Sequence, residues 1–252
     1  MFELSAFPNL ILFLSLGICT LVQLYFFWGI FSRLSFFKPS ALSTHDEEPV
    51  SVIIAARNEQ ENLVKNLPAI LEQEYPDFEV VVVNDCSWDD SQQILEEMQL
   101  QYPRLKVSEL IEQEKYPTGK KFALTIGIKA AKNDLLLFTD ADCMPASNQW
   151  LKLMQSRFRP GKEIVLGYSP YVKESGLLNL YIRFETFMTA LFYFSFALMR
   201  NAFMGVGRNL AYHRETFFRH KGYATHQHIL SGDDDLFVNA AAHKGNVDMP
   251  YQ

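Results

Sequence analysis

Two aspartates one residue apart follow a strongly apolar run in the stretch LLLFTDADCMP (135–145). Asp140 and Asp142 offer carboxylate oxygens, which are the ligands that hard divalent cations such as Mg²⁺ and Mn²⁺ prefer. A cation held by the pair would in turn hold a diphosphate. Asp and Pro are also common turn residues, so the pair taken alone fits a turn at the end of a strand equally well.

A second acidic cluster lies in LSGDDDLFVNAAAHKG (230–245). Gly232 permits an unusual backbone turn there, and Asp233 or Asp234 can begin a helix. Acids at a helix start are commonly caps favoured by the helix dipole. A carboxylate in a partly buried site can instead serve as a general base, because burial raises its pKa toward working pH.

Alternating strands and helices are predicted to position these acids. Pro68 is expected to kink or divide the first of the helices. Strands of about six residues that alternate with helices of about twelve predict an α/β fold, in which helices cover both faces of a mostly parallel sheet. The expected strands are 50–55, 78–85, 106–111 and 135–140, and the expected helices are 60–73, the region 88–100 and 119–131.

Polar residues follow several of these strands. In open parallel sheets, ligands bind at the carboxyl ends of the strands. Asp85 ends the second strand, Asp140 and Asp142 follow the last, and the range 57–59 follows the first. Three strands are therefore expected to deliver polar side chains to one edge of the sheet.

Four stretches in this order resemble the family 2 glycosyltransferases, which are inverting enzymes of the Rossmann-like GT-A fold. They are VSVIIAARNEQENL, VVVNDCSWDDS, TGKKFALTIGIKAA and LLLFTDADCMP, and the resemblance covers most of residues 49–245. It implies that one group of residues contacts the nucleobase and ribose and that Lys120, after Gly119, lies near the phosphates. A solvated helix position, like that expected for Lys121, is the alternative for Lys120. The implied nucleotide-sugar residues are Ala55, Arg57, Asn58, Glu59, Asp85, Lys120, Asp140 and Asp142, and the last two also bind the metal.

The second acidic cluster resembles the Glu-Asp-x-Asp-Leu stretch of these transferases, whose first Asp is the general base. Aligned on Leu236, the base is Asp233, and Gly232 replaces the family's Glu. This departure leaves Asp234 as an alternative base.

The resemblance also places MGVGRNLAYHR (204–214) at the acceptor side. The acceptor-side candidates in that stretch are Gly205, Gly207 and Asn209.

The resemblance implies a sugar transferred from a nucleoside-diphosphate sugar, in the first place a UDP-sugar, to a lipid-linked or glycan acceptor with Mg²⁺ or Mn²⁺. A sugar-nucleotide-binding or scaffold module without turnover is the alternative. It arises because the sequence ends at VDMPYQ, without the Gln-x-x-Arg-Trp stretch and further spanning helices usual in membrane-bound relatives. A nucleotidyltransferase fits less well, since AARNEQEN has no glycine for the loop such enzymes use.

The N-terminal segment is predicted to span a membrane. From Leu10 to Phe31 the sequence has no charged residue, and as a helix this stretch would measure roughly 33 Å, about one hydrocarbon core. Glu3 and the bulky aromatic end of the run argue against a cleaved signal peptide. Arg33 and Lys38 follow the span and no Lys or Arg precedes it, so the positive-inside rule places the remaining chain in the cytoplasm at an inner or plasma membrane.

A second apolar stretch, 177–200, contains Arg183 and Glu185 and is too interrupted for a clean bilayer span. It is predicted to lie at the membrane surface, with burial against the sheet as the alternative.

The domain plan is therefore a membrane anchor (1–37), a linker (38–49) and a GT-A domain (50–252). We expect that domain to comprise a nucleotide-sugar half (50–145) and an acceptor half (146–252), and to be incomplete at its C-terminus.

Composition excludes some other classes. A net charge of -6 provides no basic surface for nucleic acid. The three cysteines have no CxxC or Cys/His spacing, so neither a disulfide framework nor a zinc site is indicated, and a reducing compartment fits best.

Overall fold

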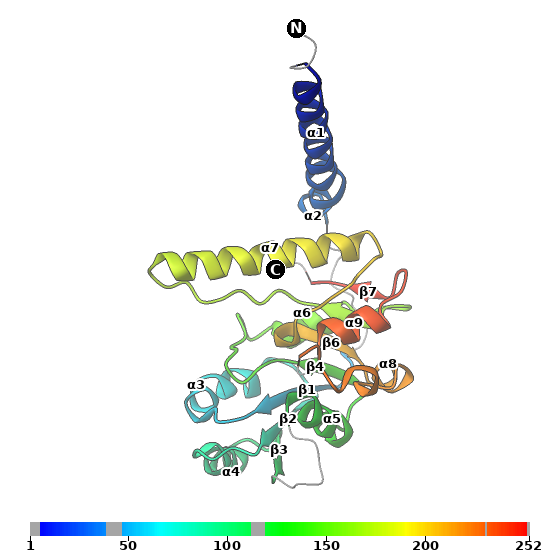
Figure 1. The fold of residues 1–252 in the computed structure, drawn as a ribbon. Helices are drawn as coiled ribbons and strands as arrows, with labels where there is room; N and C mark the ends of the chain where they lie inside the picture. Colours follow the sequence, from blue (N-terminus) through cyan, green and yellow to red (C-terminus); the bar gives the residue numbers. More distant parts are fainter. Residues whose placement is uncertain (1–5, 39–46, 112–118, 230, 251–252) are drawn as a thin grey trace.

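The protein has an N-terminal helical stalk that stands on an α/β domain (Figure 1). The computed structural model describes residues 6–38, 47–111, 119–229 and 231–250, so positions 39–46 of the predicted linker lie outside the described residues. The stalk consists of α1 (Ala6–Leu24), the π-helical segment η1 (Tyr25–Phe31) and α2 (Ser32–Ser35).

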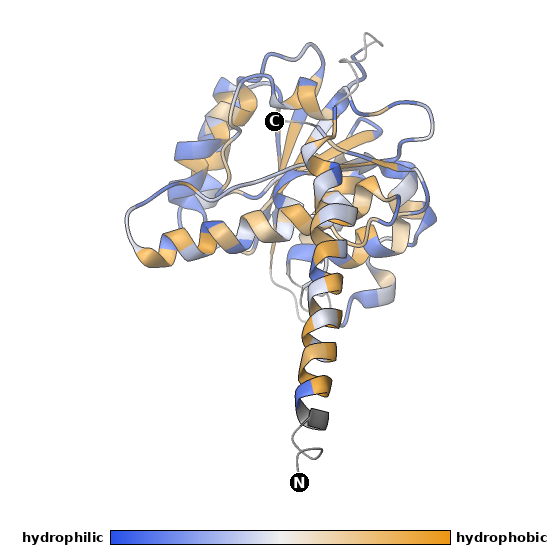
Figure 2. Cartoon of the chain, turned by 90° about the horizontal axis from the view of Figure 1, so that it is seen from above, coloured by the Kyte–Doolittle hydropathy of each residue, from blue (hydrophilic) through white to orange (hydrophobic). Residues whose placement is uncertain are grey.

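The stalk is long and apolar enough to cross a membrane by length and composition. Its candidate span, Asn9–Ser35, has 27 residues, which corresponds to about 40 Å of helix. Figure 2 shows apolar residues along most of α1, and their side chains are exposed rather than packed in a core. The predicted span 10–31 lies within this helix.

One sheet organises the domain. Its strand order is β3-β2-β1-β4-β6-β5-β7. β1 is parallel to β2 and β4, β2 is parallel to β3 and β5 to β7, whereas β6 is antiparallel to both β4 and β5. The mostly parallel α/β prediction is confirmed. The strands are β1 (Val50–Ala56), β2 (Phe78–Asp85), β3 (Leu105–Leu110), β4 (Leu135–Phe138), β5 (Ile164–Leu166), β6 (Leu210–His213) and β7 (Val247–Asp248).

Helices cover both faces of the sheet. Along β1, Val52 and Ile54 pack into one core cluster and Ile53 into the other, which explains why the strand is continuously apolar. The helices of the first face are α3 (Gln60–Leu71), α4 (Ser91–Gln101) and α6 (Trp150–Gln155). Those of the second are α5 (Lys120–Ala130), α7 (Leu177–Leu198), α8 (Arg214–Arg219) and α9 (Asp235–Ala241); short 3₁₀ turns are η2 (Gly207–Asn209) and η3 (Ala224–His226).

Pro68 was expected to kink or divide its helix, and of these two outcomes the division is wrong. α3 runs through Pro68 from Gln60 to Leu71. Proline removes one helical hydrogen bond, to the carbonyl four residues earlier. That carbonyl belongs to Val64, a residue on the exposed side of α3.

Helix α7 connects the stalk to the sheet. Its C-terminal half is buried through Ala190, Tyr193 and Phe194, and its Phe192 ring meets Phe31 of the stalk edge to face with centroids 5.0 Å apart. Its N-terminal half instead exposes large apolar side chains, among them Leu177 and Phe184. The helix runs across the foot of the stalk (Figure 1). Burial against the sheet, the alternative, therefore applies to the C-terminal half of α7, whereas its N-terminal half is exposed and its place at a membrane surface stays a prediction.

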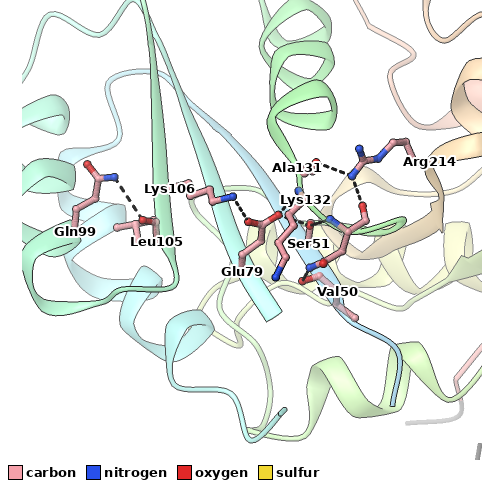
Figure 3. A network of polar contacts seen from close by, with 10 residues as sticks. Val50, Ser51, Glu79, Gln99, Leu105, Lys106, Ala131, Lys132 and Arg214 are labelled. Atoms are coloured by element: carbon pink, nitrogen blue, oxygen red, sulfur yellow. Dashed lines mark hydrogen bonds and ion pairs between the residues drawn. The ribbon is translucent and has the colours of Figure 1, made fainter. Parts of the chain in front are cut away.

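A buried carboxylate joins three strands at the amino end of the sheet (Figure 3). Glu79 on β2 accepts hydrogen bonds from Ser51 Oγ of β1, at 2.6 Å, and from the backbone N–H of Lys132. Its other oxygen lies 2.6 Å from Lys106 Nζ of β3. Burial by itself raises the pKa of Glu79, but the bonds from Lys106, Ser51 and Lys132 outweigh burial and hold the pKa below its usual value.

We expect Glu79→Gln to lower the free energy of unfolding at neutral pH by about 1–3 kcal/mol, because a neutral amide loses the charge-assisted bonds. A depressed folded-state pKa contributes stability above the unfolded-state pKa and loses it as pH falls through the folded value. The difference between wild type and variant should therefore shrink below about pH 4. Urea unfolding of the full chain in detergent micelles measures it. Glu97→Gln, at an exposed position on α4, is the matched control; equal stabilities at neutral pH would contradict the assignment.

Candidate active site

The carboxyl ends of β2, β1 and β4 meet at one edge of the sheet, since these strands are parallel neighbours. A cavity of about 350 Å³ opens there, which we call the strand-end cavity. Every residue predicted to bind the nucleotide sugar lines it, with the exception of Asn58. The lining residues are Ala55, Ala56, Arg57, Glu59, Asp85, Gly119, Lys120, Asp140, Ala141 and Asp142.

Asp85 forms one wall of this cavity and is 3% exposed. Its Oδ2 lies 4.0 Å from Arg57 Nη1. Its Oδ1 is buried and has no hydrogen-bond partner among the residues that the structure describes. A buried carboxylate oxygen without a donor is costly, so the Asp85 carboxylate has the capacity to accept a further hydrogen bond.

Asn58 shapes the rim rather than the lining. Its φ of 57° lies in the left-handed region, which asparagine tolerates better than most residues. Its backbone N–H donates to Ser87 Oγ at 2.9 Å, and its Oδ1 accepts from the Trp88 N–H at 3.0 Å. Asn58 thus fastens the loop after β1 to the loop after β2.

Lys120 joins the two acidic clusters. Gly119, with a φ of 118°, precedes α5 and sets the entry of the chain into the helix. Lys120 Nζ then lies 2.8 Å from Asp140 Oδ1 and 3.3 Å from Asp233 Oδ2. Burial alone would lower the pKa of Lys120, but the carboxylates of Asp140 and Asp233 raise it above its usual value. The ammonium therefore stays charged between clusters that are distant in sequence.

Asp140, Asp142 and Cys143 form a potential metal-binding group, because one ligand atom from each lies within 4.8 Å of the others. Burial, followed by the Asp142 carboxylate, raises the pKa of Cys143 to about 12. The thiol is therefore protonated, and it donates to Asp142 Oδ1 at 3.4 Å. The two carboxylates remain as hard oxygen donors, which fit Mg²⁺ or Mn²⁺.

The structure distinguishes Asp233 from Asp234. Asp234 caps α9: its Oδ1 accepts from the Asp235 N–H and its Oδ2 from the Gly207 N–H, each at 2.7 Å. Within the described ranges, Asp233 accepts no such backbone bond from another residue, and it faces Lys120. Burial raises the pKa of Asp233, and Lys120 opposes that shift only in part. Of the two carboxylates, Asp233 has the environment of a proton acceptor.

Gly232, the residue that departs from the expected motif, is required by the backbone. Its φ of 92° disfavours any side chain, and a Cβ there would collide with Leu236. The glycine therefore lets the chain turn directly into α9 and present Asp233.

The sequence of the central region matches a known family. The model of the family described as "Glycosyl transferase family 2" matches residues 51–219, which is more than half of the chain. The chain belongs to glycosyltransferase family 2.

Individual relatives match over part of their length. The chain is 39% identical over 105 residues to Glycosyltransferase AglE of Haloferax volcanii, which covers 41% of this chain and 33% of that protein. It is 31% identical over 107 residues to Beta-monoglucosyldiacylglycerol synthase of a Nostoc species, which covers 42% of this chain and 22% of that protein. These matches span a third or less of the relatives' own lengths.

A solved structure agrees with the fold. Mannosyltransferase PcManGT from Pyrobaculum calidifontis, in complex with GDP-Man and Mn²⁺, superposes with a TM-score of 0.62 at 22% identity, covering 90% of this chain and 63% of that one. The fold of the family 2 domain is therefore GT-A, as expected from the sequence.

The three acceptor-side candidates of this family 2 domain differ in their contacts. Gly207 lies against the acidic pair, since its N–H binds Asp234. Gly205 instead lies close to apolar side chains. A Cβ added to it would lie only 3.0 Å from the side chain of Leu166. Asn209 is buried, accepts from Trp150 Nε1 at 3.0 Å and donates to the Tyr168 carbonyl at 2.9 Å. Of the three, Gly207 is therefore the one hydrogen-bonded to the second acidic cluster.

Lys121, expected to be solvated, is 7% exposed. Its ammonium donates to the carbonyls of His226, at 2.9 Å, and Ile229, at 3.0 Å. This contact fastens the start of α5 to the segment that leads toward Asp233. The sequence offered no local signal for it, since the partners are backbone atoms more than a hundred residues away.

Proposed function

We propose that this family 2 domain moves a sugar from a nucleoside-diphosphate sugar to a lipid-linked or glycan acceptor by a single inverting displacement. The position of Lys120 between Asp140 and Asp233 carries the proposal, because it unites a diphosphate site with a candidate base. Arg57, Glu59 and Asp85 would contact the nucleoside, while Lys120, Asp140 and Asp142 would lie at the diphosphate.

In the proposed reaction, Asp233 accepts the proton of an acceptor hydroxyl as its oxygen attacks the anomeric carbon. The bond from that carbon to the diphosphate oxygen breaks through an oxocarbenium-like state, and the configuration inverts. Lys120 offsets the charge that develops on the leaving nucleoside diphosphate. A divalent cation held by Asp140 and Asp142 would supply further electrostatic stabilisation of that charge.

The stalk supports a membrane location for the reaction. We infer that α1 anchors the protein and, by the positive-inside rule, that the domain 50–252 lies on the cytoplasmic side. A diacylglycerol-glycosylating relative agrees with a lipid acceptor. The halves 50–145 and 146–252 would then bind donor and acceptor, respectively.

A donor panel in membranes that contain the complete open reading frame tests this function. UDP- and GDP-sugars should each be offered with and without Mg²⁺ or Mn²⁺, and released nucleoside diphosphate should be measured. We expect release from one donor class, dependent on metal. Tight binding without release would favour a non-catalytic module, and pyrophosphate release from a nucleoside triphosphate with a sugar phosphate would favour a nucleotidyltransferase.

A further inference from the structure

Two further cavities share lining residues with each other, and one of them also shares a lining residue with the strand-end cavity. The first, of about 190 Å³, is bounded by Thr186 and Thr189 of α7 and is called the α7 cavity. The second, of about 200 Å³, is bounded by Asp142 and is called the Asp142 cavity. Both are lined by Ser169, Tyr171 and Arg208. Asp142 also lines the strand-end cavity. The Asp142 cavity is therefore next to the strand-end cavity on one side and next to the α7 cavity on the other.

Arg208 stands at the junction with unused hydrogen-bonding capacity. Its Nη1 donates to Tyr171 Oη at 3.2 Å, and its Cζ lies 5.0 Å from the centroid of that ring. Its Nε is buried without a hydrogen-bond partner within the described part of the chain. A guanidinium has five N–H donors, and the side chain of Arg208 is only partly buried, so donors remain that a ligand in the cavities can use.

Two other arginines of the domain have acceptors for their terminal nitrogens, although the Nε of Arg214, like that of Arg208, is buried without a hydrogen-bond partner among the described residues. Arg219 lies 2.8 Å from Glu163 Oε2, and Arg214 donates to the Ala131 carbonyl at 2.6 Å. Among the described residues, no carboxylate lies within 4.0 Å of Arg208, although Glu185 also lines the α7 cavity. Lys65 adds a second cation to the Asp142 cavity. The Asp142 cavity therefore has two cations, Lys65 and Arg208, against one carboxylate, Asp142, and this excess favours an anion as its occupant.

The position of the junction favours an amphiphilic molecule. α7 contributes Thr186 and Thr189 to the cavity wall, and its N-terminal half exposes Leu177 by 84% and Phe184 by 54%. The same helix crosses the foot of the stalk, where a membrane surface would lie (Figure 1). A lipid could therefore lie along α7 while its head group enters the cavities.

We propose that Arg208 and Tyr171 bind the phosphate that links a lipid to the sugar of the acceptor. Arginine suits this role because its planar fork binds phosphate oxygens bidentately. The phosphate is a binding group and not the nucleophile, since a hydroxyl of the attached sugar would give its proton to Asp233. Gly207, which precedes Arg208, contacts Asp234, so the subsite lies beside the acidic pair. The description of the ligand as an acceptor rests on the proposed function.

Binding of a fluorescently tagged polyprenyl phosphate to the full chain in detergent micelles, followed by anisotropy, tests the subsite without requiring turnover. We expect Arg208→Gln to weaken this binding by about tenfold to a hundredfold. Arg208→Lys keeps the positive charge but loses the planar guanidinium group. Its affinity for the tagged lipid should lie between those of the wild type and Arg208→Gln. A tagged polyprenol, which lacks the phosphate, should bind wild type and Arg208→Gln equally. Calorimetry should show unchanged affinity for nucleoside diphosphates, and thermal melting should show that the variant is folded.

Lys173→Gln is the matched control, because it removes a cation from an exposed position near Tyr171 that lines neither cavity. Three results would overturn the proposal. In the first, Arg208→Gln binds the tagged polyprenyl phosphate as tightly as the wild type does. In the second, Arg208→Gln loses as much affinity for nucleoside diphosphates as for the lipid phosphate. In the third, glycerol phosphate displaces the tagged lipid as readily as polyprenyl phosphate does. The second would assign Arg208 to the donor, and the third would assign it to soluble phosphate esters. If no donor is turned over, the proposed function fails while the binding result still decides the subsite.

Discussion

An Asp142→Asn variant is expected to lose metal-dependent turnover by at least about a hundredfold in kcat/KM while the domain remains folded. The amide keeps the shape of the side chain but removes one of the two charges at the proposed metal site. Asp142 is exposed, and its side chain accepts a hydrogen bond from the neighbouring Cys143, so folding should not depend on it. Nucleoside diphosphate release against Mg²⁺ or Mn²⁺ concentration measures the effect, and urea unfolding checks the fold.

Two variants sharpen this experiment. Asp134→Asn removes an exposed carboxylate just before β4, at the opposite end of the same strand, and should leave turnover unchanged. Asp142→Glu keeps the charge and should retain part of the activity at higher metal concentration. Wild-type metal dependence in Asp142→Asn would refute the metal role. If Asp134→Asn lost as much turnover as Asp142→Asn, the loss in Asp142→Asn would reflect a change in the structure and not the removal of a metal ligand.

The strand-end cavity was predictable because its signals are local. Apolar runs of suitable length marked β1, β2 and β4, and the rule that ligands bind at the carboxyl ends of parallel strands placed Arg57, Asp85 and Asp140 together. Each step required only the residues within one strand and the turn that follows it.

Contacts that depend on distant partners were not predictable in this way. β6 is inserted antiparallel beside β4, with Leu210 opposite Phe138, and β5 has only three residues, too few to show a period. Asn58 and Asn209 resemble ligand-binding residues by type, yet each is committed to protein hydrogen bonds. The type of a polar residue therefore predicted that its side chain would form hydrogen bonds, but it did not predict whether the partner would be the protein or a ligand.

Arg208 illustrates the same limit. It lies between Gly207 and Asn209, both of which were selected from the sequence, but its own importance depends on Tyr171 and on the two cavities that meet there. Nothing in the local spacing distinguishes an arginine with unused donors from one that is paired.

Asp233→Asn is expected to reduce kcat by about 10²- to 10⁴-fold, because an amide cannot accept the proton of the acceptor hydroxyl. Donor affinity should be preserved, since Asp140 remains 2.8 Å from Lys120 and holds it near the proposed diphosphate site. Single-turnover transfer and calorimetry with the nucleoside diphosphate measure the two quantities separately. A parallel loss of both would indicate that Asp233 acts through Lys120 on donor binding.

Asp234→Asn is the discriminating partner of this variant. Asn is a good helix cap, and its amide oxygen can still accept one of the two backbone N–H groups that Asp234 serves, from Gly207 and Asp235. We therefore expect a loss of about 1 kcal/mol in stability and a much smaller fall in kcat than in Asp233→Asn. If Asp234→Asn instead abolishes transfer with unchanged stability and Asp233→Asn does not, the base is Asp234. The motif would then be displaced by one residue, and Gly232 would serve to aim Asp234 rather than Asp233 at the acceptor.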